Sequence, residues 1–187
     1  MTGKKREQLL DCAASLFRAN GFRATGIDRI LEASGCAKMT LYNHFGSKEA
    51  LILACVRRAD EAWRTAVAAE LEQRCSDPRE RLLAVFDIAA DIVGDDNFCG
   101  CFFLRAAHEF HDLDDPVHAA AADNKRLFMD YLAGIAAAAG AREPETLAKS
   151  LLMLLDGAIS YVHVCGDASA AALARQNAAM LIERYLA

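Results

Sequence analysis

Proline is scarce in this chain, with only 3 among 187 residues. An all-β sandwich needs frequent turns and collagen needs far more proline, so both classes are excluded. Hydrophobic residues make up 54% of the sequence and charged residues 25%, which also excludes a disordered chain. The length suits one ordinary domain, or a small domain attached to a larger one. The composition therefore predicts a compact helical protein.

The sequence also lacks a secretion signal and a membrane-spanning run. Residues 1–6 include three basic residues with no apolar segment after them, and no apolar run approaches the roughly 20 residues that cross a bilayer. Seven cysteines are many for this length, but an odd number does not suit a disulfide scaffold. We therefore expect a soluble cytoplasmic protein with reduced thiols and no membrane partner.

Motifs of nucleotide-binding and hydrolytic sites are missing as well. The chain has no Walker A loop, no Gly-x-Ser-x-Gly and no Gly-x-Gly-x-x-Gly after a strand. His108 and His111 share one helix face at spacing i, i+3, which differs from the His-Glu-x-x-His of zinc peptidases. Two residues on one helix rarely hold a metal without further ligands. We expect neither catalysis, nor a cofactor, nor a specific metal site.

Positive charge is in the minority overall but is concentrated at one end. The net charge of the chain is −5. Residues 1–50 hold eight Lys or Arg against five Asp or Glu, a net charge of +3, whereas residues 51–187 hold 13 against 21, a net charge of −8. A basic head suits an anionic partner, and an acidic body would repel one.

Apolar residues recur at helical spacing along most of the chain, with breaks at glycine and proline. Thr25 has the position of an N-cap for a short helix that ends at Gly35, and Ser47 can cap a long helix after Gly46. We predict nine helices and no strand: 5–20, the short helix between Thr25 and Gly35, 37–45, 48–75, 79–93, 100–111, 116–139, 144–164 and 169–186.

Two of these short helices, joined by a glycine turn, form a helix-turn-helix. Their sequence resembles the N-terminal domain of the TetR family of bacterial transcriptional repressors. The resemblance lies in Ala13-Ala14-Ser15-Leu16-Phe17, Gly21-Phe22, Thr25-Gly26-Ile27, Ile30-Leu31, Ser34-Gly35 and Thr40-Leu41-Tyr42-Asn43-His44-Phe45-Gly46-Ser47-Lys48-Glu49-Ala50-Leu51. It implies an all-α fold of about nine helices. Residues 1–50 would form a three-helix DNA-binding head, and residues 51–187 a larger helical body for effector binding and dimerisation.

The second helix of the motif would enter the major groove of DNA. The predicted DNA contacts are Lys38, Met39, Thr40, Tyr42, Asn43, His44 and Lys48. The resemblance implies that Thr40, Tyr42 and Lys48 meet phosphates. It also implies that Lys38, Met39 and Asn43 lie nearer the bases. His44 either lies near the DNA or packs against the protein.

The motif departs from the family at positions that influence which DNA sequence is bound. The family commonly has Ser or Thr as the cap of this helix and a small residue two positions later, where this chain has Ala37 and Met39. An alanine cap loses on the order of 1 kcal/mol and a hydroxyl that could meet a phosphate. We therefore still expect DNA binding, but the operator sequence does not follow from the resemblance.

Cys99 and Cys101 flank Gly100 in the body. The pair Gly100-Cys101 resembles the Gly-Cys that opens the sixth helix in a broad branch of the family, which implies a structural role for Cys101. The Cys-x-Cys spacing also suits a sulfenate or disulfide switch. Free cysteines are otherwise small buried hydrophobes. Redox sensing and inert packing therefore stay open for this pair.

Aromatic residues of the body are candidates for a largely apolar effector site. The predicted lining consists of Trp63, Phe86, Phe102, Phe103, Phe110, Phe128, Met153 and Tyr161, with His108 and Asp156 as polar groups. We expect His108 to be partly buried. Each aromatic residue taken alone can also be a plain core residue. Ligand binding would act on the head through the long helix 48–75.

The last two predicted helices favour a homodimer built as a four-helix bundle, with burial inside one chain as the alternative. The predicted faces comprise Leu147, Leu151, Leu154, Ala158, Val162, Ala171, Ala174, Ala178, Leu181, Ile182 and Tyr185. The sequence thus predicts a repressor that is released from a palindromic double-stranded DNA operator by a small-molecule or redox effector. The alternative is a DNA-bound adaptor or architectural protein without an effector.

Overall fold

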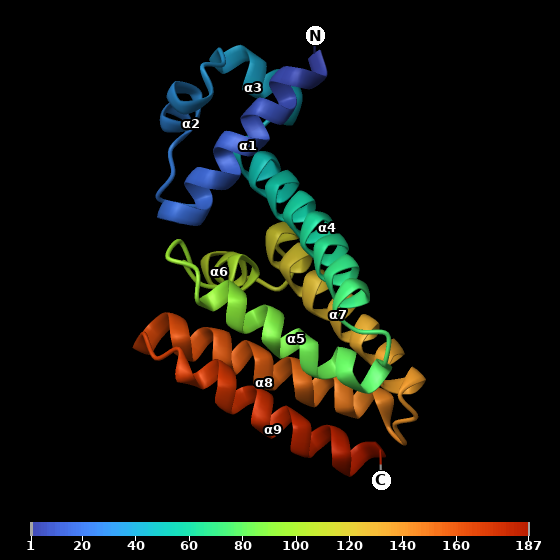
Figure 1. Cartoon of the computed structure of the whole chain (residues 1–187). Helices are drawn as coiled ribbons and strands as arrows, with labels where there is room; N and C mark the ends of the chain where they lie inside the picture. Colours follow the sequence, from blue (N-terminus) through green and yellow to red (C-terminus); the bar gives the residue numbers. More distant parts are fainter. Residues whose placement is uncertain (1, 187) are drawn as a thin grey trace. The chain divides into compact units, whose positions relative to one another are not determined.

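The computed structural model describes residues 2–186, which form nine helices and no strand (Figure 1). They are α1 (Thr2–Asn20), α2 (Ile27–Ser34), α3 (Lys38–Phe45), α4 (Lys48–Arg74), α5 (Pro78–Val93), α6 (Phe102–Glu109), α7 (Pro116–Ala138), α8 (Pro144–Cys165) and α9 (Ser169–Leu186). The all-α prediction is confirmed. α6 is shorter than predicted, because Gly100 has a φ of 86°, which lies outside the helical region.

Contacts divide the chain into two compact units. The head unit comprises Met1–Glu61 and Phe102–Asn124, and the body unit comprises Ala62–Cys101 and Lys125–Ala187. α4 and α7 contribute residues to both. The predicted boundary after residue 50 follows the order of the chain, whereas the compact head unit also includes α6 and the first part of α7. Long-range packing therefore groups elements that the linear sequence separates.

The core of the head unit lies where α1, α2 and α3 meet. Phe17, Phe22, Ile30 and Leu41 have no exposed surface. Gly35 ends α2 in the left-handed conformation, with a φ of 62°. This turn brings α3 back onto α1 and α2 and completes the helix-turn-helix.

The turn between α1 and α2 differs from the prediction. Gly26, rather than Thr25, is the N-cap of α2, and it makes no side-chain cap bond. Thr25 is buried, and its hydroxyl donates to the backbone oxygen of Gly21 at 2.7 Å. The prediction of a Thr25 cap is wrong, because the hydroxyl satisfies a carbonyl group inside the turn instead of an N–H group of α2.

The core of the body unit is formed mainly by α5, α8 and α9, which pack against one another (Figure 1). Leu82 and Phe86 of α5 meet Leu151 of α8 and Ala178 of α9 in this core. Seven residues predicted for the dimer face are buried within the chain: Leu147, Leu151, Val162, Ala171, Ala174, Ala178 and Ile182. The dimer prediction is wrong for these residues, since spacing identifies an apolar face without showing which surface it meets.

α8 is long and apolar enough to cross a membrane by length and composition alone, with a mean hydropathy of 1.3 over its 18-residue window. Polar residues such as Lys149 and Asp156 interrupt it, so it is not a continuous apolar run. Part of this window, 33%, is buried in the structure. Met153, Tyr161 and Val164 of the same helix are exposed. Apolar side chains thus lie on two faces of α8, and one of these faces packs inside the body unit.

Candidate functional site

α3 has one face packed on the protein and one face open to solvent. Leu41 is fully buried, whereas Met39 is 70% exposed and Tyr42 is 37% exposed. The other predicted contact residues of α3 divide into Lys38 and Asn43, which are exposed, and Thr40 and His44, which are half-buried. An α-helix fits the major groove and reads base edges with such an exposed arc.

The beginning of α3 lacks a side-chain cap. Ala37 has the extended backbone of an N-cap residue, but it offers no acceptor to the N–H groups of the first turn. These N–H groups carry the positive end of the helix dipole, and Lys38 adds a full positive charge. This end of α3 therefore favours an anionic partner such as a phosphate.

Ser47 and Lys48 define the beginning of α4. The hydroxyl oxygen of Ser47 accepts the N–H of Ala50 at 3.1 Å, which confirms the predicted cap. The Lys48 ammonium donates to the backbone oxygen of Arg23 at 3.0 Å. An ammonium has three donors, so Lys48 retains donors for a phosphate. The bond ties α4 to the turn between α1 and α2, a contact that no sequence pattern indicates.

Four residues predicted to line an effector site belong to the head unit. Phe102, Phe103 and Phe110 are buried. The ring of Phe22 lies 4.9 Å from that of Phe102 and 6.1 Å from that of Phe110, measured between centroids. His108 is exposed, so the expectation of a partly buried histidine is wrong. These aromatic side chains join α6 to the turn between α1 and α2.

The other six predicted lining residues belong to the body unit. Trp63 and Phe128 pack edge to face, with centroids 4.6 Å apart. The Asp156 carboxylate accepts a hydrogen bond from the Lys125 ammonium at 2.5 Å. Met153 and Tyr161 are exposed. Phe86 alone among the ten predicted residues lines a pocket between α5, α8 and α9 of this unit.

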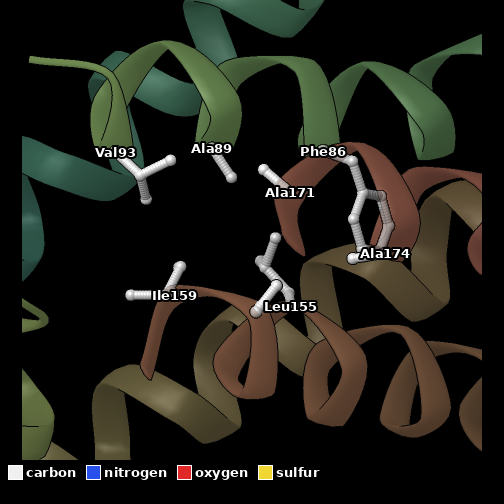
Figure 2. A pocket seen from close by; sticks show the side chains of 8 residues that line it. Phe86, Ala89, Val93, Leu155, Ile159, Ala171 and Ala174 are labelled. Atoms are coloured by element: carbon white, nitrogen blue, oxygen red, sulfur yellow. The ribbon is translucent and has the colours of Figure 1, made fainter. Parts of the chain in front are cut away.

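This pocket lies between α5, α8 and α9 and has a volume of about 200 Å³, open solvent included. Its lining is formed by Phe86, Ala89, Val93, Leu155, Ala158, Ile159, Ala171 and Ala174. Figure 2 shows Val93 and Ala89 on one side of it, with Leu155 and Ile159 on the other. Open solvent accounts for part of this volume, so the enclosed space is smaller, and a drug-sized ligand would have to enlarge it. Four of the eight lining residues are alanines, so a prediction based on large aromatic side chains does not include this pocket.

Cys101 lies beside a positively charged group. The Lys125 ammonium is 3.9 Å from the Cys101 sulfur and also pairs with Asp156. A Cβ atom added to Gly100 would lie 2.9–3.0 Å from the ring of His163, so this ring packs directly on the Cys-x-Cys segment. Both Cys99 and Cys101 are half-buried. Lys125 and His163 are distant in sequence, and the motif by itself does not point to them.

The other cysteines differ in their surroundings. Burial raises the pKa of the Cys55 thiol to about 12 and also raises the pKa of Cys12. Cys165 is exposed. Within residues 2–186, no three or more His, Cys, Asp or Glu side chains are grouped to hold a metal ion.

The helix-turn-helix, the exposed arc of α3 and the helical body define the class of helix-turn-helix DNA-binding regulators. A family profile described as "Bacterial regulatory proteins, tetR family" matches residues 9–55. A second profile, "Tetracyclin repressor-like, C-terminal domain", matches residues 78–178. The chain therefore belongs to the TetR family of transcriptional regulators.

Individual relatives agree with this assignment. The HTH-type transcriptional regulator LmrA of Bacillus subtilis (strain 168) is 39% identical over 83 residues, 44% of each chain. The HTH-type transcriptional activator FasR of Mycolicibacterium smegmatis is 34% identical over 94 residues, 50% of this chain and 42% of FasR. The chain thus matches less than half the length of these two relatives. SCO4454, a TetR-family transcriptional regulator from Streptomyces coelicolor, has a crystal structure that superposes on this one with a TM-score of 0.85 and a sequence identity of 30%. The match covers 98% of this chain and 95% of SCO4454.

Proposed function

We propose that this regulator is a repressor that binds a palindromic double-stranded DNA operator as a homodimer in the cytoplasm. The exposed arc of α3 carries the proposal. In this proposal Lys38, Met39 and Asn43 lie at the base edges, and Thr40, Tyr42 and Lys48 contact phosphates. His44 is half-buried, and the centroid of its ring lies 6.2 Å from that of Phe45. Steric exclusion of RNA polymerase from an operator near the promoter would repress transcription.

The outer faces of α8 and α9 support the homodimer. Met153, Tyr161 and Val164 recur on one face of α8, and Leu173 and Met180 are seven residues apart on α9. All five side chains are exposed in the single chain. Exposed apolar patches mark interaction sites, and a second copy of the same surface gives a closed twofold dimer. A twofold dimer matches a palindrome whose half-sites lie roughly 34 Å apart.

The body unit is the proposed site of effector binding. The pocket between α5, α8 and α9 is lined entirely by apolar side chains, so a ligand that enlarges it would have to be apolar. Trp63, Phe128 and the Lys125–Asp156 pair belong to the same unit and are candidates to meet a larger one. α4 belongs to both units, which makes it a route for coupling to the head. The ligand and the DNA would weaken each other's binding by one common factor.

An oxidant is the second candidate effector, and the position of Lys125 beside Cys101 favours it. The Cys101 thiolate would attack hydrogen peroxide, cleave the O–O bond and form a sulfenic acid with release of water after protonation. The Cys99 thiol would then displace water from the sulfenic acid and form a disulfide. Peroxide should lower DNA affinity in the wild type, a thiol reductant should restore it, and Cys101→Ser should abolish the response.

Selection of duplexes from a random library by the full-length protein tests the DNA-binding proposal. A twofold-symmetric selected sequence is expected, and an asymmetric or unselected pool would contradict it. A reporter promoter carrying the selected sequence then separates a repressor, which lowers transcription, from an activator. If a ligand found by screening binds free and DNA-bound protein equally, the adaptor or architectural protein becomes the better explanation.

A further inference from the structure

Glu109, the last residue of α6, binds the turn between α1 and α2. One of its carboxylate oxygens accepts the N–H of Phe22 at 3.0 Å, and the other accepts the N–H of Arg23 at 2.7 Å. Two consecutive N–H groups that follow a residue with positive φ form a small anion-binding concavity in the backbone. Hydrogen bonds to an ionised carboxylate are stronger than those between neutral groups. We refer to this pair of bonds as the Glu109 turn contact.

Gly21 makes room for the carboxylate. Its φ is 84°, and a Cβ atom added there would lie 2.8 Å from an oxygen of Glu109. Any other residue at this position would therefore meet both backbone strain and a collision with the carboxylate. The carbonyl groups of the turn are bound as well, since Thr25 donates to Gly21 and Lys48 donates to Arg23. Side chains from α4 and α6 thus hold the backbone of this one turn.

A second polar contact joins α6 to the end of α1. The Arg105 guanidinium donates to the backbone oxygen of Arg18 at 2.6 Å. The Arg18 guanidinium in turn lies 4.9 Å from the centroid of the Phe102 ring. All these groups belong to the head unit. α6 therefore contacts both the last turn of α1 and the segment that leads directly into α2.

We infer that Glu109 is a positioning residue for DNA binding: its carboxylate holds the α1–α2 turn in the conformation from which α2 and α3 present the recognition surface. The inference rests on DNA binding by the head and is independent of any effector. Without the carboxylate, the head would populate other turn conformations, and the apparent affinity would fall with the fraction of binding-competent molecules.

The direction of the effect separates positioning from simple electrostatics. Glu109 is negatively charged, so its removal should strengthen binding to polyanionic DNA if charge alone mattered. Positioning predicts the opposite result. Glu32 provides a matched control, because it is an exposed glutamate of α2 in the same unit. Both residues lose one negative charge when replaced by glutamine.

The experiment measures binding of full-length Glu109→Gln and Glu32→Gln to two duplexes, one selected from a random library by the wild type and one unselected. Glutamine keeps one acceptor oxygen but places an NH2 group against the second backbone N–H. We expect Glu109→Gln to weaken binding to the selected duplex about tenfold or more. Glu32→Gln should leave it unchanged or tighter. Equal behaviour of the two variants would overturn the proposal.

Amide hydrogen exchange reports on the turn without DNA. In Glu109→Gln, exchange at Phe22 and Arg23 should accelerate, whereas exchange in the α8 and α9 amides should not change. Unchanged exchange at Phe22 and Arg23 would overturn the proposal. Global unfolding of Glu109→Gln would also overturn it, since Glu109 would then be required for folding. If the wild type selects no duplex while the exchange result holds, the operator proposal fails and the turn contact stands.

A double-mutant cycle with Gly21→Ala gives an independent check. Alanine at this position meets backbone strain in any background, but it collides with the carboxylate only when Glu109 is present. Gly21→Ala should therefore weaken DNA binding by a larger factor in the wild type than in Glu109→Ala. Equal factors in the two backgrounds would show that the two positions are not coupled.

Discussion

The contacts inside the head unit differ in kind from the contacts inside the body unit. In the head unit, α6 meets the N-terminal helices through directional polar bonds made by Glu109 and Arg105, next to a few aromatic rings. In the body unit, α5, α8 and α9 share a broad apolar core. Hydrophobic burial is strong but non-directional, whereas hydrogen bonds specify position and contribute less net stability. Substitutions in the body should therefore change stability most, and substitutions in the head should change DNA binding most.

The largest expected effect is on the stability of the body core. Leu151→Ala should lower the free energy of unfolding by about 2–5 kcal/mol, because the side chain is 1% exposed and its removal leaves a cavity. Urea unfolding followed by circular dichroism at a fixed protein concentration measures this. Lys149→Ala, at an exposed position of the same helix, is the control and should change stability by no more than about 0.5 kcal/mol. Similar losses for both variants would contradict the comparison.

The next effect concerns the outer face of α8. Tyr161→Glu should weaken the dimer about a hundredfold, which corresponds to ~2.8 kcal/mol, because the interface would have to desolvate an unpaired charge. Sedimentation velocity across a range of concentrations gives the dissociation constant. Leu113→Glu introduces the same charge at an exposed site of the head unit and should leave the dimer unchanged. A wild-type protein that is monomeric at micromolar concentration would refute the proposed interface.

A smaller effect separates the two kinds of DNA contact in the head. Asn43→Ala should change which base is preferred at one operator position, by about 1–3 kcal/mol. Lys48→Ala should weaken binding to all duplexes and reduce the salt slope by about 1. Binding titrations on single-base variants of the selected duplex, at several salt concentrations, test both. Equal losses on every duplex for both variants would show that the division into base and phosphate contacts is wrong.

The smallest effect is on thiol reactivity and leaves the fold unchanged. Burial raises the pKa of Cys55 to about 12, so almost no thiolate is present at pH 8 in the folded protein. Iodoacetamide at pH 8 should therefore modify exposed Cys165 while Cys55 stays unmodified, as read by peptide mass spectrometry. In urea both should react. Rapid labelling of Cys55 in the native protein would mean that this part of α4 opens readily.

The sequence predicts the local elements of this protein well because they depend on neighbouring residues. The spacing of apolar residues and the stops at Gly35 and Gly46 locate the helix-turn-helix, and Ser47 caps α4 as predicted. The Thr25 prediction failed because its hydroxyl found a nearer carbonyl group in the turn. Local patterns specify that a polar group needs a partner, but they do not choose between two partners within reach.

Predictions that required knowledge of distant neighbours were less successful. The faces of α8 and α9 are apolar on more than one side, so spacing alone identified side chains such as Leu147 and Ile182 that pack inside the chain. The sequence predicts one lining of aromatic residues, but Phe102 and Phe110 pack on Phe22 whereas Trp63 packs on Phe128. A helix sequence shows which side chains avoid water, and only packing shows what they meet.

The sequence by itself determines that this protein is an all-α TetR-family regulator with a basic, DNA-binding head, because helix periodicity, capping and the Thr40 to Leu51 run are local properties. The tertiary structure alone decides that Glu109 meets the Phe22 and Arg23 amides, that Lys125 lies beside Cys101, and that an apolar pocket remains between α5, α8 and α9. These pairs are separated by 24 to 87 residues in the chain. Their proximity results from the packing of whole helices, which no single stretch of sequence specifies.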